Sequence, residues 1–156
     1  MKIIGVDPGT ATSGIGVIEG SRKTDFKSIY YGCIKTEANS PIEDRIFTIY
    51  RDLNKVIEKF KPEVLALEEL FFNTNPKTAM SVGRASGVII LSGITNNLKL
   101  VEFTPLQVKI AITGYGRADK KQVQSMIAKL LRLNEIPKPD DAADALAIAY
   151  CAGVSL

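Results

Sequence analysis

Four acidic residues, Asp7, Glu68, Asp141 and Asp144, stand at positions where carboxylates can do chemistry. Each of the first two ends an apolar run typical of a buried strand, and the other two are three residues apart at the start of an alanine-rich stretch. Such acids need a cation, because burying an unpaired carboxylate costs several kcal/mol. Mg²⁺ takes oxygen ligands, and two such ions about 4 Å apart can activate a water against a phosphodiester. The four acids therefore predict a site for Mg²⁺, with two ions per site and with Mn²⁺ able to substitute.

Two strands and a helix must bring these acids together. Asp7 ends an expected strand at 2–7, and Glu68 ends the apolar part of a strand that begins at 64. The helix between these strands makes a right-handed crossover, which sets the second strand parallel to a neighbour. Sites in such sheets lie at the carboxyl ends of strands, and residues three apart on a helix share a face. We therefore expect the four carboxylates to converge at one edge of the sheet.

Each acid also has a purely structural interpretation. Asp141 and Asp144 could cap the last helix and interact with its dipole. Glu68 could mark a strand end that meets solvent, and Asp7 could be a turn residue. These alternatives stay open for each residue alone, and only the combination favours a metal site.

The whole sequence predicts an α/β fold with a five-stranded mixed sheet, three antiparallel strands and then two parallel ones, flanked by helices. We expect Ser40 to cap the first helix, with Pro41 at its first position and Glu43 completing a capping box. The expected elements are strands at 2–7, 14–19 and 26–36, a helix at 40–61, a strand from 64, a helix at 76–97, a strand at 99–103, a short helix after Thr104-Pro105, a helix capped by Asp119 and a last helix at 140–153.

The amino-acid composition excludes several kinds of catalytic and metal site. The 156 residues contain no histidine, which excludes Ser-His-Asp and Cys-His nucleophile systems and histidine-ligated zinc. Cys33 and Cys151 lie far apart and lack the spacing of a metal site. No apolar run reaches the ~18 residues of a membrane span, and the N-terminus lacks a signal-peptide core. We expect a single domain over residues 1–156 in the reducing cytoplasm, away from membranes.

Charge is unevenly distributed along the chain. Residues 105–132 hold six basic side chains and one acid, a net charge of +5, whereas residues 133–156 hold one basic side chain and four acids, a net charge of −3. A basic segment next to an acidic one suggests an anionic partner held beside a cation site. Solvated helix faces would explain the same split without any partner.

Four stretches, in this order, resemble the signature regions of the RuvC family of bacterial Holliday-junction resolvases. They are GVDPGTATSGIGVI, LALEELFFNTN, QVKIAITGYGRADKKQVQSMIAKLL and PDDAADALAIA, and the resemblance covers residues 3–150. It implies a ribonuclease H-like fold and a homodimeric, Mg²⁺-dependent endonuclease. Such an enzyme nicks two symmetric strands of a four-way DNA junction in recombination and repair, and it works with the RuvA–RuvB branch-migration complex.

The resemblance also implies roles for individual residues. Lys109 and Lys120 match family lysines near the scissile phosphate, where an ammonium group can stabilise the transition state. Phe71 matches an aromatic position that the family uses against unstacked bases, although Phe71 could instead be part of the core. The residues that match the metal-binding carboxylates are Asp7, Glu68, Asp141 and Asp144.

Other residues near these motifs have weaker assignments. Arg117 and Lys121 are expected to contact the DNA backbone. Arg84 is expected to bind DNA, although it stands two positions away from the basic residue that family members often carry in this helix. Asp140 is expected to be a helix cap. Since no histidine accompanies the last acids, water activation would fall to the metals.

A stripe of small residues, Ala79, Gly83 and Gly87, lies at four-residue spacing on the second helix. It permits close helix approach, either within the chain or across a two-fold interface. Symmetric cutting of two strands requires two active sites, which favours a homodimer.

Three other functions compete with a junction nuclease. An actin-like or sugar-kinase ATPase also begins with a strand, Asp, Gly and Thr, but needs two such domains. A nuclease of the same fold could act on another nucleic acid, such as an RNA–DNA hybrid. A catalytically inactive junction-binding scaffold would not need all four acids.

Overall fold

The computed structural model describes residues 1–69 and 76–156 of the chain. Its elements are β1 (Lys2–Asp7), β2 (Thr12–Glu19), β3 (Lys27–Lys35), α1 (Ile42–Phe60), β4 (Val64–Glu68), α2 (Pro76–Thr95), β5 (Lys99–Phe103), α3 (Pro105–Thr113), α4 (Lys120–Leu130) and α5 (Asp140–Ser155). The sheet has the order β3-β2-β1-β4-β5. β1 and β2 pair antiparallel, as do β2 and β3, whereas β4 is parallel to both β1 and β5. The predicted mixed sheet, with three antiparallel strands followed by two parallel ones, is confirmed.

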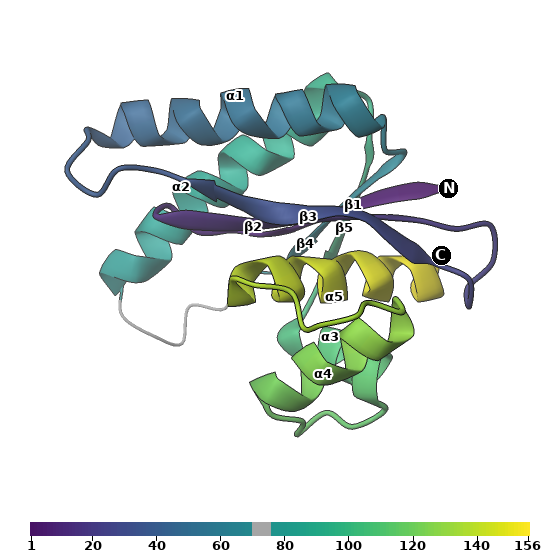
Figure 1. The fold of residues 1–156 in the computed structure, drawn as a ribbon. Coiled ribbons are helices and arrows are strands. Elements are labelled where there is room, and N and C mark those ends of the chain that lie inside the picture. The colour runs from purple at the N-terminus through teal and green to yellow at the C-terminus, as the bar shows by residue number, and fades with distance from the viewer. Residues whose placement is uncertain (70–75) are drawn as a thin grey trace.

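The helices form a layer on each face of the sheet, as Figure 1 shows. α1 and α2 lie on one face, and α5 lies on the other with α3 and α4 beyond it. Successive residues of a strand point to opposite faces, so β1 contributes to two cores. Ile4 and Val6 pack with α1 and α2, whereas Ile3 packs with α5. Each strand of the sheet centre is therefore covered on both sides.

Helix α5 lies unusually close to β1 and β2. Cβ atoms built on Gly5 and Gly14 would overlap the backbone carbonyls of Ala145 and Asp141, and one on Gly16 would lie 2.7 Å from the Leu146 nitrogen. The helix meets these glycines with an alanine-rich, almost wholly buried surface. Small residues on both elements thus let the helix backbone rest directly on the strands, which fixes its position closely.

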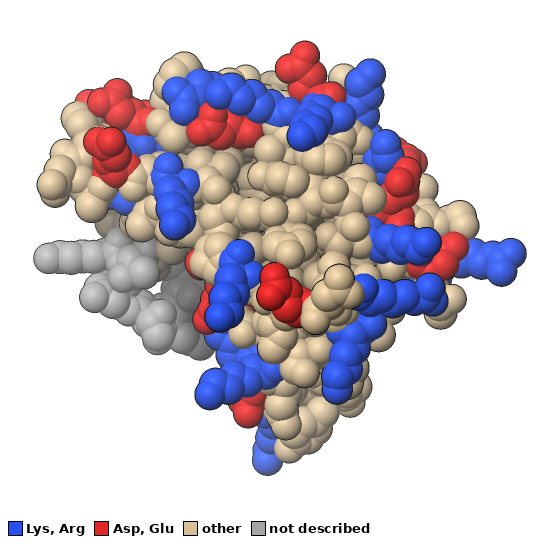
Figure 2. All heavy atoms as spheres, viewed as in Figure 1, with Lys and Arg blue, Asp and Glu red and all other residues tan. Residues whose placement is uncertain are grey.

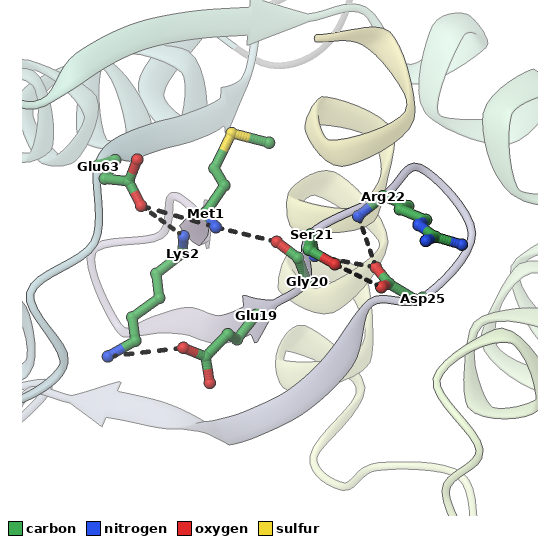
Figure 3. Close-up of polar contacts among 8 residues, drawn as sticks. All are labelled: Met1, Lys2, Glu19, Gly20, Ser21, Arg22, Asp25 and Glu63. Atoms are coloured by element: carbon green, nitrogen blue, oxygen red, sulfur yellow. Dashed lines mark hydrogen bonds and ion pairs between the residues drawn. The ribbon is translucent and has the colours of Figure 1, made fainter.

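Polar contacts hold the end of the sheet at which β1 begins (Figure 3). The amino group of Met1 donates to the Gly20 carbonyl at 2.9 Å, and Glu63 accepts from the Lys2 backbone at 3.0 Å. The expected turn between β2 and β3 is closed by Asp25, which accepts from two backbone N–H groups. These bonds hold the pKa of the Asp25 carboxyl below its usual range, chiefly through Arg22.

Of the three expected helix caps, Ser40, Asp119 and Asp140, only Asp119 is confirmed. Asp119 accepts from the backbone three residues on, in a complete capping box with Gln122, and Thr104 forms the same kind of box with Gln107 at the start of the expected short helix. The Ser40 cap is wrong: Pro41 is extended (φ −51°, ψ 148°), so α1 begins one residue later, without a side-chain cap.

Two further boundaries differ from expectation. Asp140 is not the cap of α5, because Pro139 is extended and takes that position, leaving Asp140 as the first helical residue. β2 begins at Thr12, two residues earlier than expected, since its pairing with β3 continues to Lys35. Over the described residues, no helix is both long and apolar enough to cross a membrane.

Candidate active site

Asp7 and Glu68 end neighbouring parallel strands. Val6 on β1 is in register with Leu67 on β4, so the two acids follow at the same edge of the sheet. Both acids also lie on the face that α5 covers, because residues two positions earlier, Gly5 and Ala66, belong to that face. The sheet alone therefore brings two of the four predicted acids together.

Helix α5 brings the other two acids, Asp141 and Asp144, to the same edge of the sheet. Gly14 is the cross-strand partner of Asp7, and the backbone of Asp141 rests directly on Gly14. Asp144 lies one helical turn further along α5, on the same face as Asp141. The close contact between α5 and β2 thus carries both acids to the end of β1.

The charges of the four carboxylates act on one another. Burial, followed by repulsion from Asp144, Glu68 and Asp141, raises the pKa of the Asp7 carboxyl to about 7. Burial and Asp144 likewise raise the pKa of Glu68, while Lys109 and Lys120 oppose this shift. The site is a concentration of negative charge that a cation would relieve.

This repulsion gives the metal-free protein a distinctive dependence of stability on pH. The folded state keeps a proton on Asp7 up to about pH 7, whereas the unfolded chain releases it near its ordinary pKa of 3.8. Between these values the folded state binds more protons, so the free energy of unfolding falls as pH rises. We expect a fall of about 2–4 kcal/mol between pH 4 and 8 in EDTA. Urea unfolding measures it, and a flat profile that Asp7→Asn leaves unchanged would contradict the charge cluster.

Lys120 forms ion pairs with two acids of α5. Its Nζ lies 2.9 Å from Asp144 Oδ2 and 3.8 Å from Asp140 Oδ2, and the bond to Asp144 raises the pKa of the lysine. The capping box of Asp119 fixes Lys120 as the first residue of α4. A pocket of about 200 Å³ opens here, and Glu68, Lys109, Lys120 and Asp144 are among its lining residues.

The carboxylates do not form a ready metal cage. Among residues 1–69 and 76–156, no three Asp, Glu or Cys side chains are arranged to hold one ion. Lys120 is paired with Asp144 instead. The donor set nevertheless fits a hard divalent cation, because it consists of carboxylate oxygens whose mutual repulsion such an ion would offset.

The remaining predicted residues lie elsewhere. Arg84 is exposed on α2 and Arg117 is exposed before α4, and neither lines the pocket of the acids. Lys121 lines a separate groove with Tyr115 and Met126. Figure 2 shows Lys and Arg side chains spread over the whole visible face, and at the lower end, formed by α3 and α4, few acids lie among them. Phe71 falls outside the described residues.

One residue beside the acids was missed from the sequence. Cys33 on β3 pairs with Gly14, and burial followed by the nearby charge of Asp141 raises the pKa of its thiol to about 11. The sequence alone does not indicate this proximity. Cys33 lies two strands away from Asp7, and only the register between β2 and β3 shows that the two residues are level with each other.

Comparison with known proteins settles the family. A sequence model of the RuvC family, described as crossover junction endodeoxyribonuclease RuvC, matches residues 3–152. The chain belongs to the RuvC family. It is 53% identical to the crossover junction endodeoxyribonuclease RuvC of Caldicellulosiruptor saccharolyticus over 97% of this chain and 91% of that protein. The RuvC of Finegoldia magna is 51% identical over 97% of this chain and 92% of that protein.

Solved structures of RuvC proteins confirm the fold. RuvC of Thermus thermophilus, solved in complex with a Holliday junction substrate, superimposes with a TM-score of 0.94 at 32% identity, covering 99% of this chain and 94% of that one. The expected ribonuclease H-like fold is thus confirmed, and so is the resemblance to RuvC resolvases. The chain is a crossover junction endodeoxyribonuclease, which decides against an actin-like ATPase and against an inactive scaffold.

Proposed function

We propose that this RuvC protein hydrolyses one phosphodiester in each of two symmetric strands of a four-way DNA junction, with Mg²⁺ held by its acidic site. The observation that carries the proposal is geometric: Asp7 and Glu68 follow in-register residues of two parallel strands, and the backbone of Asp141 rests on Gly14, the cross-strand partner of Asp7. The proposed metal-binding residues are Asp7, Glu68, Asp141 and Asp144. When bound, one or two Mg²⁺ ions would activate a water and offset the charge of the leaving oxygen.

The residues of the chain supply the positioning. Asp7 and Glu68 are fixed by strands, so they form the rigid part of the site. Asp144 is the adaptable part, since it can exchange the ammonium of Lys120 for a metal ion. Lys120 is then free to bind a phosphate oxygen of the DNA strand, and Lys109 lines the same pocket.

Exchange of Lys120 for a neutral side chain tests its role near the phosphate. We expect Lys120→Met to lower junction cleavage at saturating Mg²⁺ about a hundredfold, because a positioned charge at the reacting phosphate is lost. The matched control is Lys121→Met, one residue further on and outside the pocket. It should leave the cleavage rate of bound junction within about twofold and reduce the salt slope of binding by about one. Equal losses in both variants would contradict the assignment of Lys120.

We further propose that the protein acts as a homodimer in the cytoplasm, as a single domain. Symmetric cutting requires two sites, and α2 carries a face suited to a second copy. Met80, Leu91 and Ile94 are 63%, 52% and 59% exposed, and the space beside Gly87 is open. These four residues fall on one helical stripe. Sedimentation measures the oligomeric state.

The RuvA–RuvB complex is the proposed partner for branch migration.

A direct comparison of substrates tests the proposed function. The purified protein is incubated with a labelled four-way junction, a linear duplex of the same sequence and an RNA–DNA hybrid, each with Mg²⁺, Mn²⁺ or EDTA. We expect paired, symmetric nicks in the junction alone, with either metal and not in EDTA. Preferential cleavage of the hybrid would instead favour a nuclease of the same fold that acts on another nucleic acid.

A further inference from the structure

The turn that follows Asp7 is partly buried and is closed by hydrogen bonds between its own residues. Thr10 and Ser13 are only 5% and 1% exposed. The Ser13 hydroxyl donates to the Gly9 carbonyl at 2.6 Å, and Gly9 itself has no room for a side chain because a Cβ would overlap the Thr12 carbonyl. The turn can therefore keep its own shape, and its further contacts serve to place it relative to the rest of the molecule.

The first set of outer contacts comes from the segment between β3 and α1. The Thr36 hydroxyl donates to the Thr10 carbonyl at 2.6 Å, and the Thr36 backbone nitrogen donates to Ala11 at 3.0 Å. Thr36 in turn accepts from Arg45 Nε on α1 at 2.9 Å. These bonds hold the backbone of the turn from the side of β3.

The second outer contact comes from α2, which is 71 residues away in sequence. The Thr10 hydroxyl donates to the Ser81 backbone carbonyl at 2.9 Å and also lies against the Ser81 hydroxyl. α2 packs on the sheet face opposite to the one that carries the acids. The Thr10 side chain therefore ties the end of β1 to a helix from the other layer, at a point one helical turn before Arg84.

We propose that Thr10 is a positioning residue, which sets the placement of Asp7 for metal binding by tying the turn after it to α2. Asp7 is held on its N-terminal side by strand pairing but on its C-terminal side by this turn. Small displacements of a liganding group weaken it strongly, so loss of the tie affects metal binding before it affects folding. The inference rests on the proposed function, because it assumes that Asp7 binds the metal.

The test replaces Thr10 by Val, which has the same shape and lacks the donor. Two quantities are measured: the Mg²⁺ concentration that gives half of the metal-induced rise in melting temperature, and the one that gives half-maximal junction cleavage. We expect both to increase about three- to tenfold, the worth of one hydrogen bond. Thr10→Ser should restore both. The matched control is Thr95→Val on α2, whose hydroxyl bonds only within its own helix, and it should change neither.

Each possible result either supports or overturns the positioning role of Thr10. Unchanged Mg²⁺ dependence in Thr10→Val, even with a lower melting temperature, overturns the inference, because the tie would then be purely structural. If Thr10→Val does not fold, Thr10→Ala takes its place, because it removes the same hydroxyl donor to the Ser81 backbone carbonyl, and its unchanged Mg²⁺ dependence has the same meaning. Failure of the proposed function looks different: Asp7→Asn would then still bind Mg²⁺ and cleave the junction, whatever Thr10→Val does.

Discussion

Asp7→Asn abolishes junction cleavage while the protein continues to bind the junction. We expect the cleavage rate to fall about a thousandfold or more, because the substitution removes a charged ligand from the centre of the site. Asp7 is buried and lies near Asp144, Glu68 and Asp141, each of which raises its pKa. DNA binding depends mainly on basic side chains and should persist. Single-turnover cleavage and a mobility-shift titration, at the same Mg²⁺ and salt concentrations, measure the two quantities separately.

A second Asp→Asn variant shows whether removal of any acidic side chain would lower the cleavage rate. Asp44 is exposed in the first turn of α1, and Asp44→Asn should cleave at the wild-type rate. The Asp7 variant should also be more stable than the wild type in EDTA at neutral pH, because the repulsion is relieved. Wild-type nicking by Asp7→Asn would eliminate the proposed metal site, and joint loss of binding and cleavage would point to misfolding instead.

Gly14→Ala damages both stability and cleavage. The added Cβ overlaps the backbone carbonyl of Asp141, and backbone cannot rotate away as a side chain can. The first turn of α5 must then move off β2 and carry Asp141 and Asp144 away from Asp7. We expect a loss of about 1–3 kcal/mol in the free energy of unfolding and about a hundredfold loss in cleavage rate. Urea unfolding and single-turnover kinetics provide the measurements.

The stability part of this prediction has an internal control. Gly87 on α2 has no atom of the same chain within 4 Å of a Cβ position, so in the monomer the same exchange adds a methyl group to open space. At a protein concentration that keeps the chain monomeric, Gly87→Ala should therefore raise the free energy of unfolding by about 0.5–1 kcal/mol, as alanine does in a helix. If both variants were equally destabilised, close contact between α5 and β2 could not be the cause.

Much of the fold was predictable because the sequence signals for single helices and strands agree with the arrangement that these elements adopt in the folded chain. Thr104 and Asp119 each precede a predicted helix, and both form capping boxes with a Gln three residues on, although only the Asp119 cap was predicted. Ser40 carried the same kind of signal and failed, because Pro41 keeps an extended conformation that no propensity rule fixes. The mixed sheet followed from short turns between the first three strands and from the crossover that α1 makes to β4.

The arrangement of the acids was predictable in part. The rule for strand ends placed Asp7 beside Glu68, and their register agrees. The ion pair between Lys120 and Asp144 was not predicted, since it depends on how α4 packs against α5. Nor was the tie between Thr10 and Ser81, because a hydrogen bond across 71 residues leaves no periodic trace in the sequence.

The acids of β1 and α5 belong to the first and the last elements of the described chain. A ribosome makes more than 130 residues between Asp7 and Asp144, so a nascent polypeptide that ends before α5 carries an incomplete set of the proposed ligands. A prematurely terminated product would lack two carboxylates and the helical cover of one sheet face. The proposed metal site is therefore complete only after α5 has been synthesised and has packed on β1 and β2.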